Sequence, residues 1–124
     1  MHIVGFEHVN LRTARMSAMI DWYGEILDMT PGPRPAFTNS GAWLYLGDQP
    51  LVHLVEVSEP PEQGDNLALE HFALKGADLA GFREKLRANG IAFEETQVPG
   101  LPILQVNIWD PDRNHIHIDF EHHA

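Results

Sequence analysis

Residues 5–13 read GFEHVNLRT, and residues 67–76 read LALEHFALKG. In the first stretch apolar and polar side chains alternate, which is typical of a β-strand with two different faces. The later stretch also predicts a strand, and the order of the elements that follow is the same in both cases. An internal repeat of this kind indicates a duplicated supersecondary unit, and that duplication decides the fold.

The first copy continues with a helix. In residues 14–29, ARMSAMIDWYGEILDM, apolar side chains recur at spacings of three and four, which predicts an amphipathic helix packed on one face. The run TPGPRP at 30–35 is expected to end this helix and begin a loop, because proline fixes φ and removes a hydrogen-bond donor. Strands are predicted at 41–47 and 51–57, and a further short strand near 35–38.

The second copy follows a polar, proline-containing linker at residues 58–66. We predict a strand at 67–76, a helix at 77–90 that ends with Gly90 as its C-cap, and strands at 91–98, 101–110 and 115–121. The predicted fold is α+β, with two βαβββ modules in tandem, at about 3–57 and 67–121. They are expected to form a single domain over 1–124, with a cupped mixed sheet and the helices outside.

Four of the eight histidines follow the repeat. His8 and His71 lie 63 positions apart, and His53 and His117 lie 64 apart, so that each pair occupies matching places on the first and last strands of the copies. Alternation puts three of them on the face opposite the core, whereas the parity of His53 is ambiguous. We predict that the four bind one divalent metal ion, Zn, Ni, Co or Fe.

A single histidine in a strand is more often a hydrogen-bonded structural residue than a ligand. Four histidines at repeat-equivalent positions are not independent, which weakens that interpretation. His115 shares a face with His117 but begins its strand, so we expect it to support the site or to be exposed.

The composition excludes other classes of protein. The chain has no cysteine, which rules out disulfides, thiolate ligands and a cysteine nucleophile. Its net charge of −10 repels phosphate backbones and argues against a nucleic-acid partner. No apolar run approaches the ~20 residues that a membrane span needs. The stretch MHIVGFEHVN has no secretion-signal pattern, so a cytoplasmic protein is expected.

The segments FEHVNL, SAMIDWYGEILDM, LVHLVEV, LEHFALKG and DPDRNHIHIDF resemble the vicinal oxygen chelate superfamily, which includes glyoxalase I, fosfomycin-resistance transferases, extradiol dioxygenases and bleomycin-resistance proteins. The resemblance implies paired βαβββ modules with a metal in the cup, and places His8, His53 and His71 at ligand positions. His117 falls where most metal-binding relatives have a glutamate, and Arg113 replaces the usual turn glycine. Imidazole keeps a ligand there but removes a carboxylate that can act as a base.

The resemblance implies a metal-dependent lyase or isomerase of glyoxalase type, acting on a small substrate that chelates the metal through two neighbouring oxygens. Asp119 is the candidate catalytic residue, either as a base or as the partner that orients His117. The alternatives are an Fe(II) extradiol-type ring-cleaving dioxygenase and a non-catalytic binding or resistance protein. A homodimer is also expected. The residues predicted to line the substrate site are Trp43, Tyr45, Gln105, Asn107 and Trp109.

Overall fold

The computed structural model describes residues 1–124 and divides into two compact units, here called the first half (1–62) and the second half (63–124). The first half contains β1 (Val9–Thr13), α1 (Met16–Leu27), β2 (Thr30–Gly32), β3 (Gly41–Leu46) and β4 (Gln49–Glu56). The second half contains β5 (Phe72–Lys75), α2 (Leu79–Ala88), β6 (Glu94–Gln97), β7 (Ile103–Trp109) and β8 (His115–Glu121).

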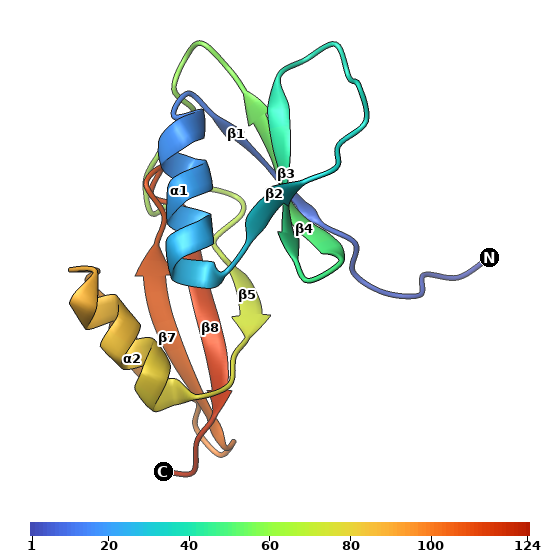
Figure 1. Cartoon of the computed structure of the whole chain (residues 1–124). Coiled ribbons are helices and arrows are strands. Elements are labelled where there is room, and N and C mark those ends of the chain that lie inside the picture. The colour runs from blue at the N-terminus through green and yellow to red at the C-terminus, as the bar shows by residue number, and fades with distance from the viewer. The chain divides into compact units, whose positions relative to one another are not determined.

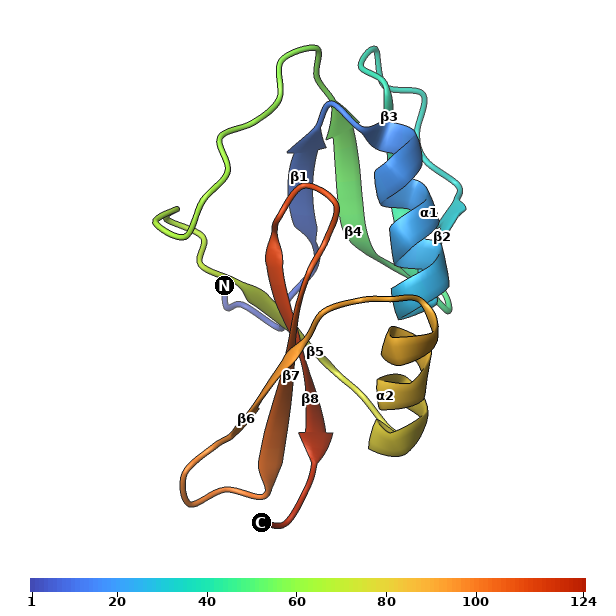
Figure 2. The same cartoon turned by 90° about the vertical axis from the view of Figure 1, so that its left-hand side faces the viewer.

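Each half has one four-stranded mixed sheet (Figures 1 and 2). The strand order is β1-β4-β3-β2 in the first half and β5-β8-β7-β6 in the second, with the first and last strands of each module parallel. The two registers agree, because Asn10 lies opposite His53 and Ala73 lies opposite His117. The predicted pair of βαβββ modules is therefore confirmed, as two separate sheets.

The buried faces of the last strands decide where the histidines point. On β4, Val52 and Leu54 are buried in the core, and on β8 the core residues are Ile116, Ile118 and Phe120. Because side chains alternate along a strand, His53 and His117 lie on the opposite faces of their sheets. The ambiguous parity of His53 is settled in favour of the same face as its counterpart.

A helix packs on the core side of each sheet. The apolar stripe of α1 buries Met19, Tyr23, Ile26 and Leu27, and each such side chain contributes roughly 1.5–3 kcal/mol to stability. Asp78 is the N-cap of α2, and its carboxylate accepts a hydrogen bond of 3.1 Å from the Gly81 amide. Asn89 is the C-cap of α2, and not Gly90 as predicted; Gly90 is the next residue and has a left-handed φ of 66°.

Two sequence predictions were wrong about strand positions near prolines. The segment Thr30–Gly32 is strand β2 and not the start of a loop, and residues 35–38 form no strand. Proline is tolerated in β2 because this strand lies at the edge of its sheet, where a missing amide donor breaks no inner ladder.

The first strand of each module is also shorter than predicted. Strand β1 begins at Val9 and β5 at Phe72, so His8 and His71 come directly before their strands rather than in the middle of them. The preceding residues make no ladder pairs within their own sheet. Their imidazoles therefore sit where the backbone enters the sheet.

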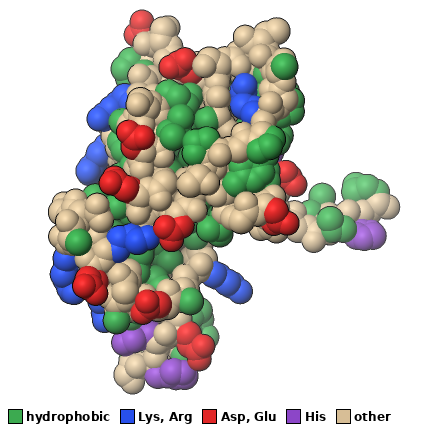
Figure 3. Space-filling view, in the orientation of Figure 1, with side chains coloured by type: hydrophobic (Ala, Val, Ile, Leu, Met, Phe, Trp, Pro, Cys, Tyr) green, Lys and Arg blue, Asp and Glu red, His purple; other side chains and the backbone are tan.

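The segment before β1 is exposed and apolar. Met1, Ile3, Val4 and Phe6 are all more than 80% exposed, and Figure 3 shows hydrophobic side chains along this end of the chain. Neither helix is both long and apolar enough to cross a membrane.

Candidate functional site

His8 and His53 form the histidine pair of the first half. Their rings stack with centroids 3.7 Å apart, and Trp43 stacks on the other side of His53 at 4.1 Å. His53 is only 6% exposed and donates from Nε2 to the Pro50 carbonyl at 3.0 Å, which leaves Nδ1 as an acceptor. His8 Nδ1 is buried without a hydrogen-bond partner, because Glu7 Oε1 is 3.6 Å away.

The electrostatics keep His53 in its neutral form. Burial lowers the pKa of His53, and the neighbouring His8 lowers it further, while the hydrogen bond to Pro50 opposes these effects. A neutral imidazole has the free lone pair that a metal ion requires. The orphaned nitrogen of His8 and the neutral ring of His53 thus fit a divalent metal ion.

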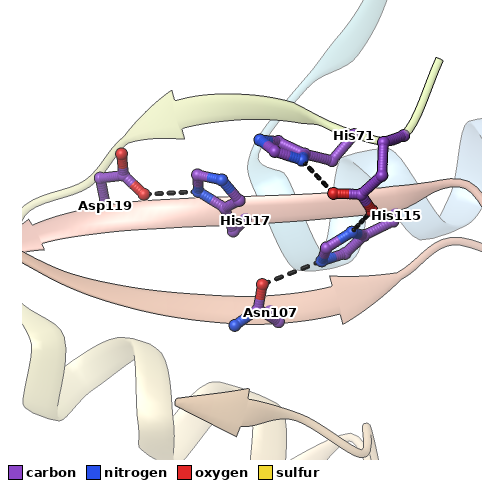
Figure 4. A network of polar contacts seen from close by, with 6 residues as sticks. His71, Asn107, His115, His117 and Asp119 are labelled. Atoms are coloured by element: carbon purple, nitrogen blue, oxygen red, sulfur yellow. Dashed lines mark hydrogen bonds and ion pairs between the residues drawn. The ribbon is translucent and has the colours of Figure 1, made fainter. Parts of the chain in front are cut away.

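His71 and His117 form the pair of the second half. Their ring centroids lie 4.3 Å apart, and His117 is 6% exposed. His117 donates from Nδ1 to Asp119 Oδ1 at 2.5 Å (Figure 4). In a neutral ring this bond places the proton on Nδ1 and the lone pair on Nε2, which is the arrangement by which carboxylates orient metal-binding histidines. Asp119 is thus the hydrogen-bond partner of the His117 ring.

Glu70 joins His71 to His115 in the second half. Its two carboxylate oxygens lie 2.7 Å from His71 Nδ1 and 2.8 Å from His115 Nδ1 (Figure 4). Hydrogen bonds from the two imidazoles, His71 first, lower the pKa of Glu70 and keep it ionised. One ligand atom from each of these three residues lies within 4.8 Å of the others, so the group has the composition of a metal site.

His115 is occupied at both ring nitrogens. Besides Glu70, its Nε2 lies 2.9 Å from Asn107 Oδ1, and its ring stacks on Trp109 at 5.0 Å. The Asn107 amide is oriented by donation from Nδ2 to the Glu94 carbonyl. His115 would have to leave one of these partners to bind a metal, whereas His117 has Nε2 available.

The residues predicted to line a substrate site divide between two cavities and other roles. Trp43 lines a cavity of about 360 Å³ with His8 and His53, and Trp109 lines one of about 590 Å³ with His71 and His115. Tyr45 lines neither cavity, and its hydroxyl donates to the Pro33 carbonyl at 2.5 Å. Gln105 and Asn107 also line neither.

Sequence reasoning missed two charged residues of these sites, Glu70 and Arg34. Glu70 follows the repeat, since Glu7 and Glu70 are 63 positions apart and each precedes a histidine of the predicted set. That spacing would have identified it. Arg34 lies in the loop between β2 and β3 and lines the first-half cavity, and no periodic pattern includes it.

Comparison with known proteins identifies the family to which the chain is similar. The model of the glyoxalase/bleomycin resistance protein/dioxygenase superfamily matches residues 5–118. "Glyoxylase I 4" of Arabidopsis thaliana is 25% identical over 119 residues, which cover 90% of this chain and 68% of that protein.

Solved structures share the fold. One is the glyoxylase/bleomycin resistance protein/dioxygenase domain from Frankia sp. EAN1pec, with a TM-score of 0.79, 21% identity, and coverage of 97% of this chain and 99% of that one. Another is a lactoylglutathione lyase from Agrobacterium tumefaciens, with a TM-score of 0.70, 15% identity, and coverage of 94% and 92%. The match of the family model over most of the sequence, with two βαβββ modules, shows that this chain belongs to the glyoxalase/bleomycin resistance protein/dioxygenase superfamily.

Proposed function

We propose that the chain is a metal-dependent lyase or isomerase of glyoxalase type, with His8, His53, His71 and His117 as its metal ligands. The observation that carries the proposal is the repeat. His53 and His117 occupy the same register position in their sheets, and each has a histidine from the entry to the first strand against its ring. Such duplication of an uncommon residue pair is unexpected for purely structural histidines.

The ion would act as a Lewis acid for a small substrate that binds it through two neighbouring oxygens. The protein's own groups orient the ligands and move the proton. Asp119 holds the His117 proton at Nδ1, so that Nε2 is the ligand atom. With 30% of its side chain exposed, Asp119 is also able to accept a proton from a bound substrate.

Glu70 with His71 and His115 supports a second candidate function. Two histidines and one carboxylate are the ligand set of many non-haem Fe(II) oxygenases. We propose ring-cleaving dioxygenase activity as the alternative for that ligand set. The hydrogen bonds at both nitrogens of His115 count against this alternative.

Metal binding by matched histidine variants tests the proposal. Purified protein is stripped with a chelator, reconstituted with Zn, Ni, Co or Fe(II), and analysed for metal content. We expect one metal ion per site in the wild type, loss of affinity in His117→Gln and His53→Gln, and retention in His115→Gln. His115 is a suitable control because it lies two residues from His117 on the same face of β8.

Two results would overturn this assignment. Less than about 0.2 metal ion per chain after reconstitution would reject a four-ligand site, since such a site retains its ion. Loss of metal in His115→Gln with retention in His117→Gln would instead assign the metal site to Glu70, His71 and His115. Oxygen uptake with a catechol by the iron form would then favour the dioxygenase, and turnover of a hemithioacetal would favour the lyase.

The exposed apolar segment before β1 supports a homodimer. Four large apolar side chains at residues 1, 3, 4 and 6 are exposed in the single chain, and burying them against a second copy would be favourable. Light scattering with size-exclusion chromatography tests this proposal, and a monomer at micromolar concentration would reject it.

A further inference from the structure

Arg34 is held in a fixed position at the first-half cavity. Its Nη1 donates to the Asn39 carbonyl at 3.1 Å, its Nη2 donates to Asn39 Oδ1 at 3.3 Å, and its guanidinium lies over the Phe37 ring at 4.8 Å. Gly41 makes room for it, because a Cβ at that position would lie 2.8 Å from Nη2. The loop thus orients the cation before any ligand arrives, which lowers the entropic cost of binding.

The guanidinium has donors to spare. Arginine carries five N–H groups, and the two bonds to Asn39 leave three of them. Nε is buried without a hydrogen-bond partner, and no carboxylate of the chain forms an ion pair with this side chain. A buried N–H without an acceptor is costly, and an anion bound at Nε would supply that acceptor.

Aromatic and imidazole rings line one side of this cavity. Phe37 lies against Trp43, with centroids 6.3 Å apart, and Trp43 continues into the stacked rings of His53 and His8. Glu7 is the only acidic residue in the lining, and its side chain is 82% exposed beside His8. A planar molecule fits such a wall, and its charge must be negative to match the arginine.

The negative net charge of the chain makes Arg34 important for the binding of an anion. At a net charge of −10, the protein as a whole repels anions, so binding one requires a local cation. The cation of this cavity is close enough to act on the histidine pair. It adds to the lowering of the His53 pKa, which burial and His8 chiefly cause.

We propose that this cavity binds a small organic carboxylate with a planar body, whose carboxylate pairs with Arg34 and whose planar part packs against Phe37 and Trp43. The inference rests on the proposed function and deepens it by naming the substrate class for the cavity beside His8 and His53. Arg34 is the residue that determines specificity for the charge, since a planar guanidinium fork matches a carboxylate in two-point contact.

Binding of benzoate to the metal-free protein tests the inference. Titration is followed by NMR at the Trp43 indole N–H, assigned with Trp43→Phe, with benzamide as the neutral isostere and inorganic phosphate as a non-planar anion. We expect saturable shifts with benzoate at a Kd in the millimolar range and none with benzamide. Arg34→Gln should weaken benzoate binding by about tenfold or more, and Arg34→Lys should keep part of it.

Arg12→Gln is the matched control, because Arg12 is an exposed arginine of the same half, on β1. The inference is overturned if benzoate binds Arg34→Gln as well as wild type, if benzamide binds equally, if phosphate alone binds, or if about 50 mM benzoate produces no shift. Unchanged amide spectra of β1 and α1, which belong to the same half as Arg34, verify that Arg34→Gln is folded. Metal content is measured separately, so failure of benzoate binding with normal metal uptake rejects only this inference, and the reverse result rejects only the metal proposal.

Discussion

The hydrogen bond between His117 and Asp119 allows a quantitative test of the proposed metal site. We consider Asp119→Asn, which removes the negative charge but keeps an acceptor oxygen. His117 is almost fully buried, and its Nδ1 is 2.5 Å from Asp119 Oδ1, so this is a short, charge-assisted bond to a buried ring.

The expected cost follows from two independent estimates. A hydrogen bond to a charged group contributes roughly 1.5–3 kcal/mol. Removing the partner that orients a metal-binding histidine costs roughly 10–100-fold in metal affinity, or about 1.4–2.7 kcal/mol. Because Asp119→Asn retains an acceptor, we expect a loss of about tenfold, and Asp119→Ala should approach the upper limit.

Competition with a metal-sensitive chelating dye measures the affinity of each variant. Glu121→Gln is the control. It removes a carboxylate on the same face of the same strand, but the Glu121 side chain is 83% exposed and lies four residues beyond His117. Urea unfolding verifies that the variants are equally folded. Equal metal affinities in Asp119→Asn and Glu121→Gln would refute the orienting role and would count against His117 as a ligand.

Three further predictions concern stability. Leu54→Ala should lower the free energy of unfolding by about 2–5 kcal/mol, because Leu54 is fully buried, whereas Val55→Ala on the other face of β4 should lower it much less. Urea titration followed by circular dichroism measures both values, and equal losses in the two variants would contradict this prediction. Arg113→Gly should stabilise the protein by about 0.5–1 kcal/mol, because Arg113 has a left-handed φ of 68°, and an unchanged or lower Tm would oppose this reasoning. The Arg83 hydrogen bond holds the pKa of Glu95 below its ordinary value, so the ion pair stabilises the fold above that value and loses its effect as pH falls through the lowered pKa. Glu95→Gln should therefore lower the Tm by about 1–4 °C at pH 7 and by nothing at pH 2, and a pH-independent difference would exclude the ion pair as the cause.

The two βαβββ modules could be predicted from the sequence because the hydrophobic pattern repeats. Alternation in β8 and the spacing of apolar residues in α1 identify both elements, and the bounds of β8 are as predicted. Strand β2 was not predicted because a proline such as Pro31 usually argues against a strand. Only the sheet order shows that β2 is an edge strand, where proline is tolerated.

The candidate site was predictable only in part. The histidines repeat along the chain, so their spacing identifies them. The contact between Glu70 and His115 spans 45 residues and depends on the parallel pairing of β5 with β8, which no local pattern specifies. Arg34 is positioned by a loop whose conformation depends on its own contacts with Asn39 and Phe37. Loop geometry of this kind is not encoded in periodicity.

The matched registers make each half of the chain an internal reference for the other. The position of His115 in the second half is occupied by Leu51 in the first, and that of Asp119 by Val55, although both halves retain the Glu-His step before the first strand. Divergence at these positions explains why Glu70 is tied to two imidazoles while Glu7 remains 3.6 Å from one. The same frame thus carries histidines with two carboxylates, Glu70 and Asp119, in the second half and stacked rings beside Arg34 in the first, and Leu51→His would place an imidazole at the position equivalent to that of His115.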